Sequence, residues 1–213
     1  MSDFVPYFQG QFDRALRMVS AEILMRPLDP KVPTVAEIKN LEESKEISSL
    51  DLLGLEAALN FQSAYNIPCS SNFSATSLSD IDVTNALIVK SCHNKLKIEL
   101  TESRDLNPVA VENLRILNFV GINLSLDDFG SRYNGLNRFV QFPWVELKID
   151  KYLIENLAQP KAEAVVESTI AYCDRLGIET VAEGVEHEWQ LDLLLKLGAT
   201  KLQGYYLHKP EPL

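Results

Sequence analysis

Hydrophobic and polar residues alternate along the chain in short runs typical of strands, and longer stretches with helical spacing separate these runs. Strands are predicted at residues 5–9, 19–25, 69–74, 96–101, 123–127, 144–149, 179–183 and 201–205. Helices are predicted at 34–46, 49–65, 78–92, 108–120, 136–140, 162–176 and 188–197. Pro108 suits a first helical position, and Gly177 and Gly198 each follow the end of a helix.

This order of elements predicts the fold class. Repeated alternation of strand and helix favours a parallel sheet with helices outside it, and eight strands favour closure into a β/α barrel. The connection between the first two strands is too short for a helical crossover, so it predicts a hairpin with an antiparallel first strand. We therefore expect residues 1–213 to form one α/β domain, a modified TIM-type (β/α)8 barrel with a reversed first strand. Whether it is excised from a longer protein is left open.

Successive side chains of a strand point to opposite faces of a sheet, which divides each predicted strand into two sets. One set is almost wholly apolar, as in Ile98 and Leu100, and is expected to pack against the helices. The other set is polar and is expected to point into the barrel: Glu22, Arg26, Ser70, Asn72, Ser74, Lys97, Glu99, Thr101, Asn123, Ser125, Asp127, Glu146, Lys148, Asp150, Glu179, Glu183, Lys201, Gln203 and Tyr205. Buried charges are costly unless they are paired or bind a metal. The polar interior therefore indicates paired charges or a metal site.

The composition narrows the class of protein. Apolar residues make up 46% of the chain, which is enough for a core and argues against intrinsic disorder. The 30 acidic and 20 basic residues give a net charge of −10, which argues against a protein that grips polymeric nucleic acid. No apolar run is long enough to span a membrane, and no secretory leader is expected. Three scattered cysteines (Cys69, Cys92 and Cys173) favour a reducing compartment, so a cytoplasmic location is expected.

Several inward residues come late in their strands, at the end of the barrel where barrel enzymes place their chemistry. They are Glu22, Asn72, Glu99, Asp127, Lys148, Glu183 and Gln203. Carboxylate and carboxamide oxygens in such number are typical ligands of Mg²⁺ or Mn²⁺. A set of buried salt bridges without metal is the alternative, although acids outnumber bases in this group.

The same residues lie in short motifs that follow one another along nearly the whole chain. The motifs are Glu22-Ile23-Leu24 with Arg26, Ser71-Asn72-Phe73-Ser74, Glu99-Leu100-Thr101-Glu102, Asp127-Asp128-Phe129-Gly130, Leu147-Lys148-Ile149-Asp150, Ala182-Glu183-Gly184-Val185-Glu186 and Gln203-Gly204-Tyr205. In this order they resemble the EAL domain family, bacterial phosphodiesterases that open cyclic-di-GMP. The family fold is a β/α barrel with a reversed first strand, in agreement with the strand pattern.

The resemblance implies a role for each residue. Glu22, Asn72, Glu99 and Asp127 would ligate one divalent cation, and Asp128 would serve a second, with Asp127 bridging. Glu183 would act on the attacking water or the second metal, and Lys148 would orient that water. Arg26 would contact phosphate, and Gln203 would contact the ligand. Glu102 and Glu186 would hold the loop after the fifth strand.

The motifs depart from the family pattern at several positions. The first motif reads Glu-Ile-Leu rather than Glu-Ala-Leu, and Pro27 replaces the usual Trp after the arginine. After Gly130 the family commonly has Thr-Gly-Tyr-Ser-Ser, whereas this chain has Ser131-Arg132-Tyr133-Asn134-Gly135. That loop contributes to the site and to the dimer contact in relatives. A homodimer is therefore only weakly expected, and activity reduced by the altered loop is expected.

Two functions of different classes follow from the resemblance. One is an enzyme that hydrolyses cyclic-di-GMP to linear pGpG with two Mg²⁺ or Mn²⁺ ions. The other is a weakly active or inactive EAL-like receptor for cyclic-di-GMP, or a protein-interaction module. All the expected acidic ligands are present, which favours the enzyme.

Overall fold

The computed structural model describes residues 4–91, 96–101, 106–130 and 135–213, and its strands form one closed barrel. Around the ring the order is β2-β3-β4-β5-β6-β7-β8-β1, and β1 pairs again with β2. The strands are β1 (Phe4–Asp13), β2 (Met18–Pro27), β3 (Cys69–Phe73), β4 (Leu96–Leu100), β5 (Asn123–Phe129), β6 (Glu146–Ile149), β7 (Glu179–Ala182), β8 (Lys201–Leu202) and β9 (Glu211–Pro212). The predicted α/β barrel of eight strands is confirmed.

The first strand is reversed, as the short first connection predicts. β1 runs antiparallel to β2, with Gln9 opposite Glu22, while the pairs from β2 to β8 are parallel. One end of β1 closes the ring against β8, where Phe12 lies opposite Leu202. The middle of β1, at Tyr7 and Phe8, pairs antiparallel with the short strand β9.

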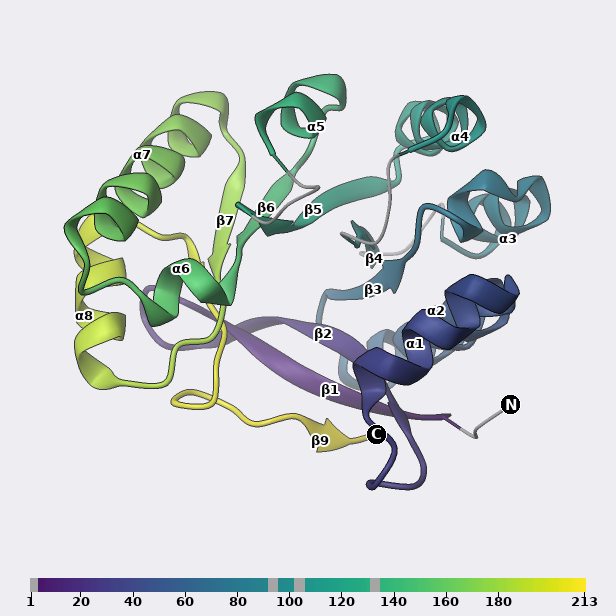
Figure 1. The fold of residues 1–213 in the computed structure, drawn as a ribbon, viewed down its shortest axis with the longest axis horizontal. Helices are drawn as coiled ribbons and strands as arrows, with labels where there is room; N and C mark the ends of the chain where they lie inside the picture. The colour runs from purple at the N-terminus through teal and green to yellow at the C-terminus, as the bar shows by residue number, and fades with distance from the viewer. Residues whose placement is uncertain (1–3, 92–95, 102–105, 131–134) are drawn as a thin grey trace.

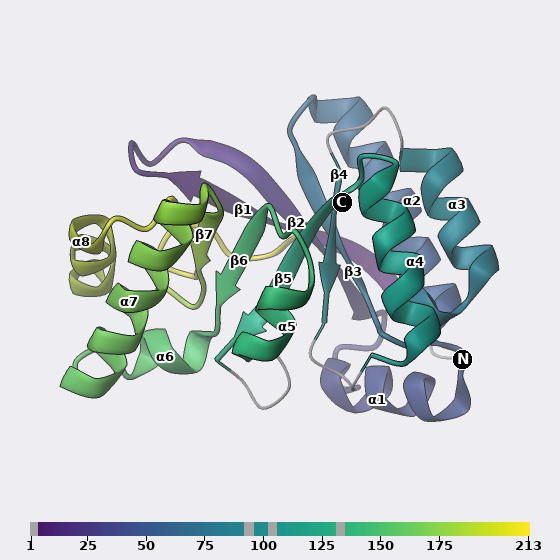
Figure 2. The same cartoon turned by 90° about the horizontal axis from the view of Figure 1, so that it is seen from above.

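The helices lie outside the ring of strands (Figures 1 and 2). They are α1 (Thr34–Ser44), α2 (Ile47–Tyr65), the 3-10 turn η1 (Ser77–Ser79), α3 (Ile81–Ser91), α4 (Pro108–Phe119), α5 (Leu136–Gln141), α6 (Lys151–Glu155), α7 (Pro160–Leu176) and α8 (Glu188–Leu197). Between helices and strands lies the apolar core, in which the outward residues of the strands, such as Ile98 and Leu126, are buried. Among the described residues, no helix is long and apolar enough to cross a membrane.

Some predicted boundaries are wrong for local reasons. The predicted helix at 78–92 is interrupted, because Asp80 is extended and its carboxylate accepts a hydrogen bond from the Asp82 amide, so that α3 begins at Ile81. The predicted last strand stops at Leu202, and Tyr205 is 54% exposed rather than inside the barrel. Helix α6 and strand β9 were not predicted.

The polar set of strand residues fills the barrel in two layers. The lower layer consists of Lys97, Ser125, Glu146 and Lys201. Two residues further along each strand lies the corresponding member of the upper layer, which consists of Glu99, Asp127, Lys148 and Gln203. All eight are less than a tenth exposed. A step of two residues along a strand keeps the same face, so one sequence pattern generates both layers. Asn123 and Glu179, at the starts of β5 and β7, are exposed instead.

Candidate active site

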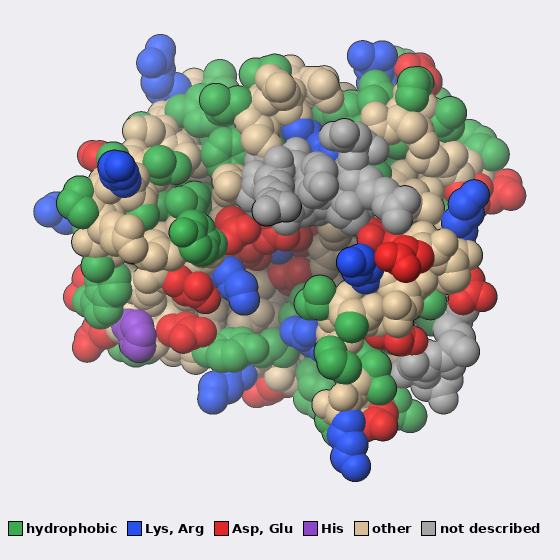
Figure 3. Space-filling view, in the orientation of Figure 1, with side chains coloured by type: hydrophobic (Ala, Val, Ile, Leu, Met, Phe, Trp, Pro, Cys, Tyr) green, Lys and Arg blue, Asp and Glu red, His purple; other side chains and the backbone are tan. Residues whose placement is uncertain are grey.

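The upper layer opens into a cavity of about 340 Å³ at the carboxyl ends of the strands. In the space-filling view, acidic side chains lie in a depression on this face, with basic side chains beside them (Figure 3). Predicted site residues that line the cavity are Glu22, Arg26, Asp127, Asp128, Lys148, Glu183, Glu186 and Gln203. Asn72 and Glu99 join them through contacts with Glu22 and Lys148. Glu102 and residues 131–134 lie outside the described residues.

Lys148 is the centre of the site. Its ammonium lies 2.8 Å from a carboxylate oxygen of Glu99 and of Glu183, 3.0 Å from Asp127 and 3.1 Å from Glu22. The lysine side chain is only 1% exposed. The structure therefore places this residue inside the barrel, surrounded by carboxylates, as the strand alternation predicts.

Glu22 uses both carboxylate oxygens. Oε1 accepts a hydrogen bond from the Asn72 amide nitrogen at 2.8 Å, and Oε2 accepts one from Gln203 Nε2 at 2.7 Å as well as from Lys148. Asn72, Gln203 and Lys148 therefore each direct a nitrogen donor toward Glu22. Because a carboxylate only accepts hydrogen bonds, it orients both amides so that their oxygens point away from it.

Two oxygens near Lys148 are buried and have no hydrogen-bond partner among the described residues. They are Asn72 Oδ1, on the amide that Glu22 orients, and Glu99 Oε1, on the carboxylate that accepts from Lys148 through its other oxygen. A buried acceptor without a partner costs free energy, typically about 1–3 kcal/mol. Both oxygens are of the type that binds hard divalent cations.

Asp127 and Asp128 approach Glu183 through an irregularity in β5. The register of β5 against β6 shifts between Leu126 and Phe129, and Asp128 has a left-handed φ of 49°. Regular strand alternation would send neighbouring side chains to opposite faces. Here one oxygen each of Asp127, Asp128 and Glu183 lie within 4.8 Å of one another, close enough to share a metal ion.

Burial and charge act on these groups in opposite directions. Burial raises the pKa of Glu99 to about 8 and that of Asp127 to about 7, and it raises the pKa of Glu183 well above its ordinary value, against the effect of Lys148. Burial also acts to raise the pKa of Glu22, but Lys148 and the hydrogen bonds from Gln203 and Asn72 outweigh it and lower that pKa. The surrounding carboxylates hold the pKa of Lys148 well above its ordinary value despite its burial. The site thus favours an additional positive charge.

The rim of the cavity carries two residues with a predicted role, Arg26 and Glu186, and two without one, Lys151 and Tyr205. Arg26 is half-buried and lines the cavity from β2, while Lys151, the first residue of α6, lines it from the other side. Tyr205 is an exposed aromatic ring on the same rim. Lys151 follows the Leu-Lys-Ile-Asp motif directly, which is the signal that could have identified it. Glu186 is exposed at the rim, and the loop it is predicted to hold lies outside the described residues.

Comparison with known proteins gives a consistent family. Residues 2–210 match the family model described as EAL domain. The chain is 36% identical over 122 residues to the Cyclic di-GMP phosphodiesterase RocR of Pseudomonas aeruginosa, a match that covers 56% of the chain but 31% of the relative. The chain thus spans about a third of the length of that curated relative.

Solved structures agree with this result. The EAL enzyme Bd1971, in a form with cAMP and cyclic-di-GMP bound, superposes with a TM-score of 0.88 at 26% identity, over 98% of this chain and 62% of that one. The PaMucR phosphodiesterase in complex with c-di-GMP superposes with a TM-score of 0.85 at 29% identity, over 98% of this chain and 92% of that one.

Proposed function

Because the chain belongs to the EAL domain family, we propose that it is a metal-dependent phosphodiesterase that hydrolyses cyclic-di-GMP to linear pGpG. A relative named cyclic di-GMP phosphodiesterase and a neighbour described as a phosphodiesterase with c-di-GMP bound support this substrate. In the reaction one P–O bond of the ring breaks, the oxygen of a water joins the phosphorus, and the freed ribose oxygen takes a proton.

One observation carries the proposal: the two unpartnered buried oxygens, Asn72 Oδ1 and Glu99 Oε1, lie in the same site as the three-carboxylate cluster of Asp127, Asp128 and Glu183. All five groups offer the oxygen ligands that Mg²⁺ and Mn²⁺ prefer. A purely structural network of salt bridges would leave no reason for two of its acceptors to stay without donors.

The residues fit two divalent cations. One ion would be held by Glu22, Asn72, Glu99 and Asp127. The other would be held by Asp127, Asp128 and Glu183. Five carboxylates and one lysine leave four uncompensated negative charges when all are ionised, which two divalent cations would balance. Such cations supply Lewis-acid stabilisation of phosphate oxygens and make water a better nucleophile at neutral pH.

The protein's own groups bind and orient the reactants. Lys148 lines the cavity with its ammonium among four carboxylates, and it would donate a hydrogen bond to the attacking water when cations take over part of its contact with those carboxylates. Glu183, whose side chain lines the cavity and is 15% exposed, would accept the proton of that water. Arg26 and Lys151 lie on the rim of the cavity. Their two positively charged side chains would suit a ligand with two phosphates.

The test is hydrolysis in vitro. The protein is incubated with cyclic-di-GMP and Mg²⁺ or Mn²⁺, and the linear dinucleotide is followed by chromatography. We expect turnover in the wild type, a loss of at least 100-fold in Glu183→Gln and Asp127→Asn, and near wild-type turnover in Ser125→Ala, which removes a buried hydroxyl of the lower layer. Binding of cyclic-di-GMP without product in the wild type would contradict hydrolysis and favour the receptor.

A homodimer and a cytoplasmic location stay predictions. Sedimentation analysis with and without cyclic-di-GMP would decide the first, and fractionation of cells the second.

A further inference from the structure

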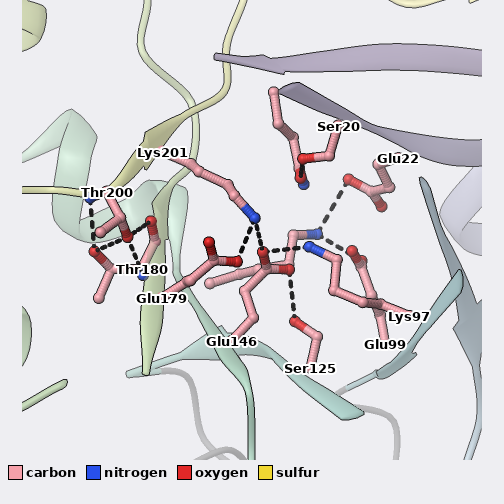
Figure 4. A network of polar contacts seen from close by, with 12 residues as sticks. Ser20, Glu22, Lys97, Glu99, Ser125, Glu146, Glu179, Thr180, Thr200 and Lys201 are labelled. Atoms are coloured by element: carbon pink, nitrogen blue, oxygen red, sulfur yellow. Dashed lines mark hydrogen bonds and ion pairs between the residues drawn. The ribbon is translucent and has the colours of Figure 1, made fainter. Parts of the chain in front are cut away.

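A chain of hydrogen bonds leads from the wall of the barrel to the predicted metal ligand Glu22. Ser20 Oγ lies 2.6 Å from Gln11 Oε1, Gln11 Nε2 donates to Gln203 Oε1 at 2.9 Å, and Gln203 Nε2 donates to Glu22 Oε2 at 2.7 Å. Ser20, Gln11 and Gln203 are 1%, 0% and 4% exposed. Figure 4 shows Ser20 and Glu22 on the same side of the barrel interior.

The charge of Glu22 fixes the direction of the whole chain. A carboxylate accepts only, so Gln203 must present its nitrogen to Glu22 and its oxygen to Gln11. Gln11 must then present its own nitrogen to Gln203 and its oxygen to Ser20, whose hydroxyl donates. Each bond in such a chain polarises the next, and the low dielectric of the interior strengthens the effect.

Gln11 is the member whose loss would matter most. Gln203 Nε2 carries two hydrogens, and it donates to Gln9 Oε1 at 3.2 Å as well as to Glu22 Oε2, so both of its donors are in use. The hydrogen bond from Gln11 holds the opposite end of that amide and keeps its nitrogen directed at Glu22. Without it, the buried oxygen of Gln203 would have no donor among the residues that contact it here.

We propose that Gln11, supported by Ser20, is a positioning residue that fixes the Gln203 amide and through it the Glu22 carboxylate in the geometry needed to bind a divalent cation. This inference rests on the cation site of the proposed function. It assigns a role to two residues of the antiparallel β1–β2 hairpin that touch neither the cavity nor a predicted metal ligand.

The test compares Gln11→Met, which keeps the length of the side chain but removes the donor, with Ser125→Ala. Ser125 is a matched control because its hydroxyl is equally buried and its hydrogen bond goes to Glu146, away from Glu22. Mn²⁺ binding is measured by titration calorimetry. We expect Gln11→Met to weaken Mn²⁺ binding about tenfold, the effect typical of groups that orient a metal ligand, and Ser125→Ala to leave it unchanged even if both variants lose thermal stability.

A double variant separates positioning from general loosening of the barrel. If Gln11 acts only through Gln203, adding Gln11→Met to Gln203→Met weakens Mn²⁺ binding no further than Gln203→Met alone. Independent, multiplicative effects of the two substitutions would overturn the inference, and so would unchanged Mn²⁺ binding in Gln11→Met.

A measurement without metal keeps this inference separate from the proposed function. The side-chain amide resonance of Gln203 in an NMR spectrum reports its hydrogen bond to Glu22, and we expect it to shift in Gln11→Met but not in Ser125→Ala. If the wild type binds Mn²⁺ but forms no linear product, the hydrolysis fails and the positioning stands. If the wild type binds no Mn²⁺, the proposed cation site fails, and the positioning of a ligand fails with it.

Discussion

A single ammonium group, that of Lys148, faces four carboxylates inside the barrel. Removing one member of a buried ionic network leaves its partners uncompensated, typically at a cost of about 3–5 kcal/mol. We therefore expect Lys148→Met to lower the free energy of unfolding by about that amount in the presence of a chelator. Part of the loss should return when Mn²⁺ is added, because the cation would replace the missing positive charge.

Urea unfolding with a chelator and with Mn²⁺ measures both effects. Lys90→Met is the control, since Lys90 pairs with Glu56 on the surface and such pairs contribute about 1 kcal/mol or less. Equal free energies of unfolding for Lys148→Met and Lys90→Met would contradict the prediction. They would mean that the carboxylates around Lys148 need no positive charge beside them.

Asp51 is a buried acid outside the candidate site, and it makes stability depend on pH. Burial raises its pKa to about 6, against the hydrogen bonds it accepts from the Ser74 amide and from nearby hydroxyls. The folded state thus holds the proton more tightly than the unfolded state, so this residue favours folding less as the pH rises from about 4 to 6. Asp51→Asn removes that dependence.

We expect the unfolding free energy of Asp51→Asn relative to the wild type to rise by about 2–3 kcal/mol between pH 4 and pH 7. The change with pH is the measured quantity, because asparagine alters the local hydrogen bonds at every pH. The other buried acids titrate in both proteins and cancel in the difference. Parallel curves over this range would show that folding does not shift the pKa of Asp51.

At the scale of elements, the loop after β8 packs directly on the loop after β7. A Cβ atom on Gly204 would lie 2.2 Å from the backbone nitrogen and oxygen of Val185, so the backbone itself excludes a side chain there. We expect Gly204→Ala to cost about 1–3 kcal/mol of stability, the usual range for overpacking. It should also weaken Mn²⁺ binding, because Gln203 is the preceding residue and would move with it.

Gly135→Ala is the matched control for this substitution. None of the residues that the structure describes lies within 4 Å of a Cβ at Gly135, and its φ of −97° suits any residue. Thermal unfolding and Mn²⁺ titration on both variants test the prediction. Normal Mn²⁺ binding by a destabilised Gly204→Ala would show that the loop contact serves stability alone.

Much of the barrel and of the candidate site could be predicted because both depend on strand alternation. Polar residues two positions apart, such as Glu146 and Lys148, lie on one face of any regular strand, so the pattern alone placed them inside the barrel. The reversed first strand followed from the length of one connection.

The parts that could not be predicted depend on irregular backbone or on distant contacts. The shift in β5 that brings Asp127 and Asp128 together breaks the alternation on which the prediction relied. Strand β9 exists because β1 offers it an edge, which no pattern near residue 211 reveals. The hydrogen bond between Gln11 and Gln203 joins residues 192 positions apart, and the strand pattern gave it no role.

At the scale of the whole molecule, the two layers of the barrel interior differ in their balance of charge. The upper layer has two acids, Glu99 and Asp127, one base, Lys148, and the neutral Gln203. In the lower layer, Glu146 accepts from Lys97, Lys201 and Ser125, and Lys201 also pairs with Glu179, so the two lysines there face two acids (Figure 4). The charges of the lower layer are therefore balanced beneath an upper layer with an excess of acids, in a molecule whose net charge is −10.

Glu146 links this arrangement to acid stability. Its burial acts to raise its pKa, but Lys97 and Lys201 outweigh burial and lower the pKa to about 2. A group whose pKa is lower in the folded state stabilises the protein above its unfolded pKa, near 4.5, and loses that contribution as the pH falls toward 2. We expect Glu146→Gln to be less stable than the wild type by about 3 kcal/mol from pH 5 to 8.

The difference between Glu146→Gln and the wild type should then shrink below pH 4.5, because protonation of Glu146 removes the same negative charge that the substitution removes. Urea unfolding between pH 3 and pH 8 measures it. A difference that stays constant with pH would mean that hydrogen bonding, which glutamine partly keeps, holds Lys97 and Lys201. A shrinking difference would mean that the charge of Glu146 lets two lysines stay buried beneath an acidic site, so that the ionic lower layer supports the barrel that carries the upper one.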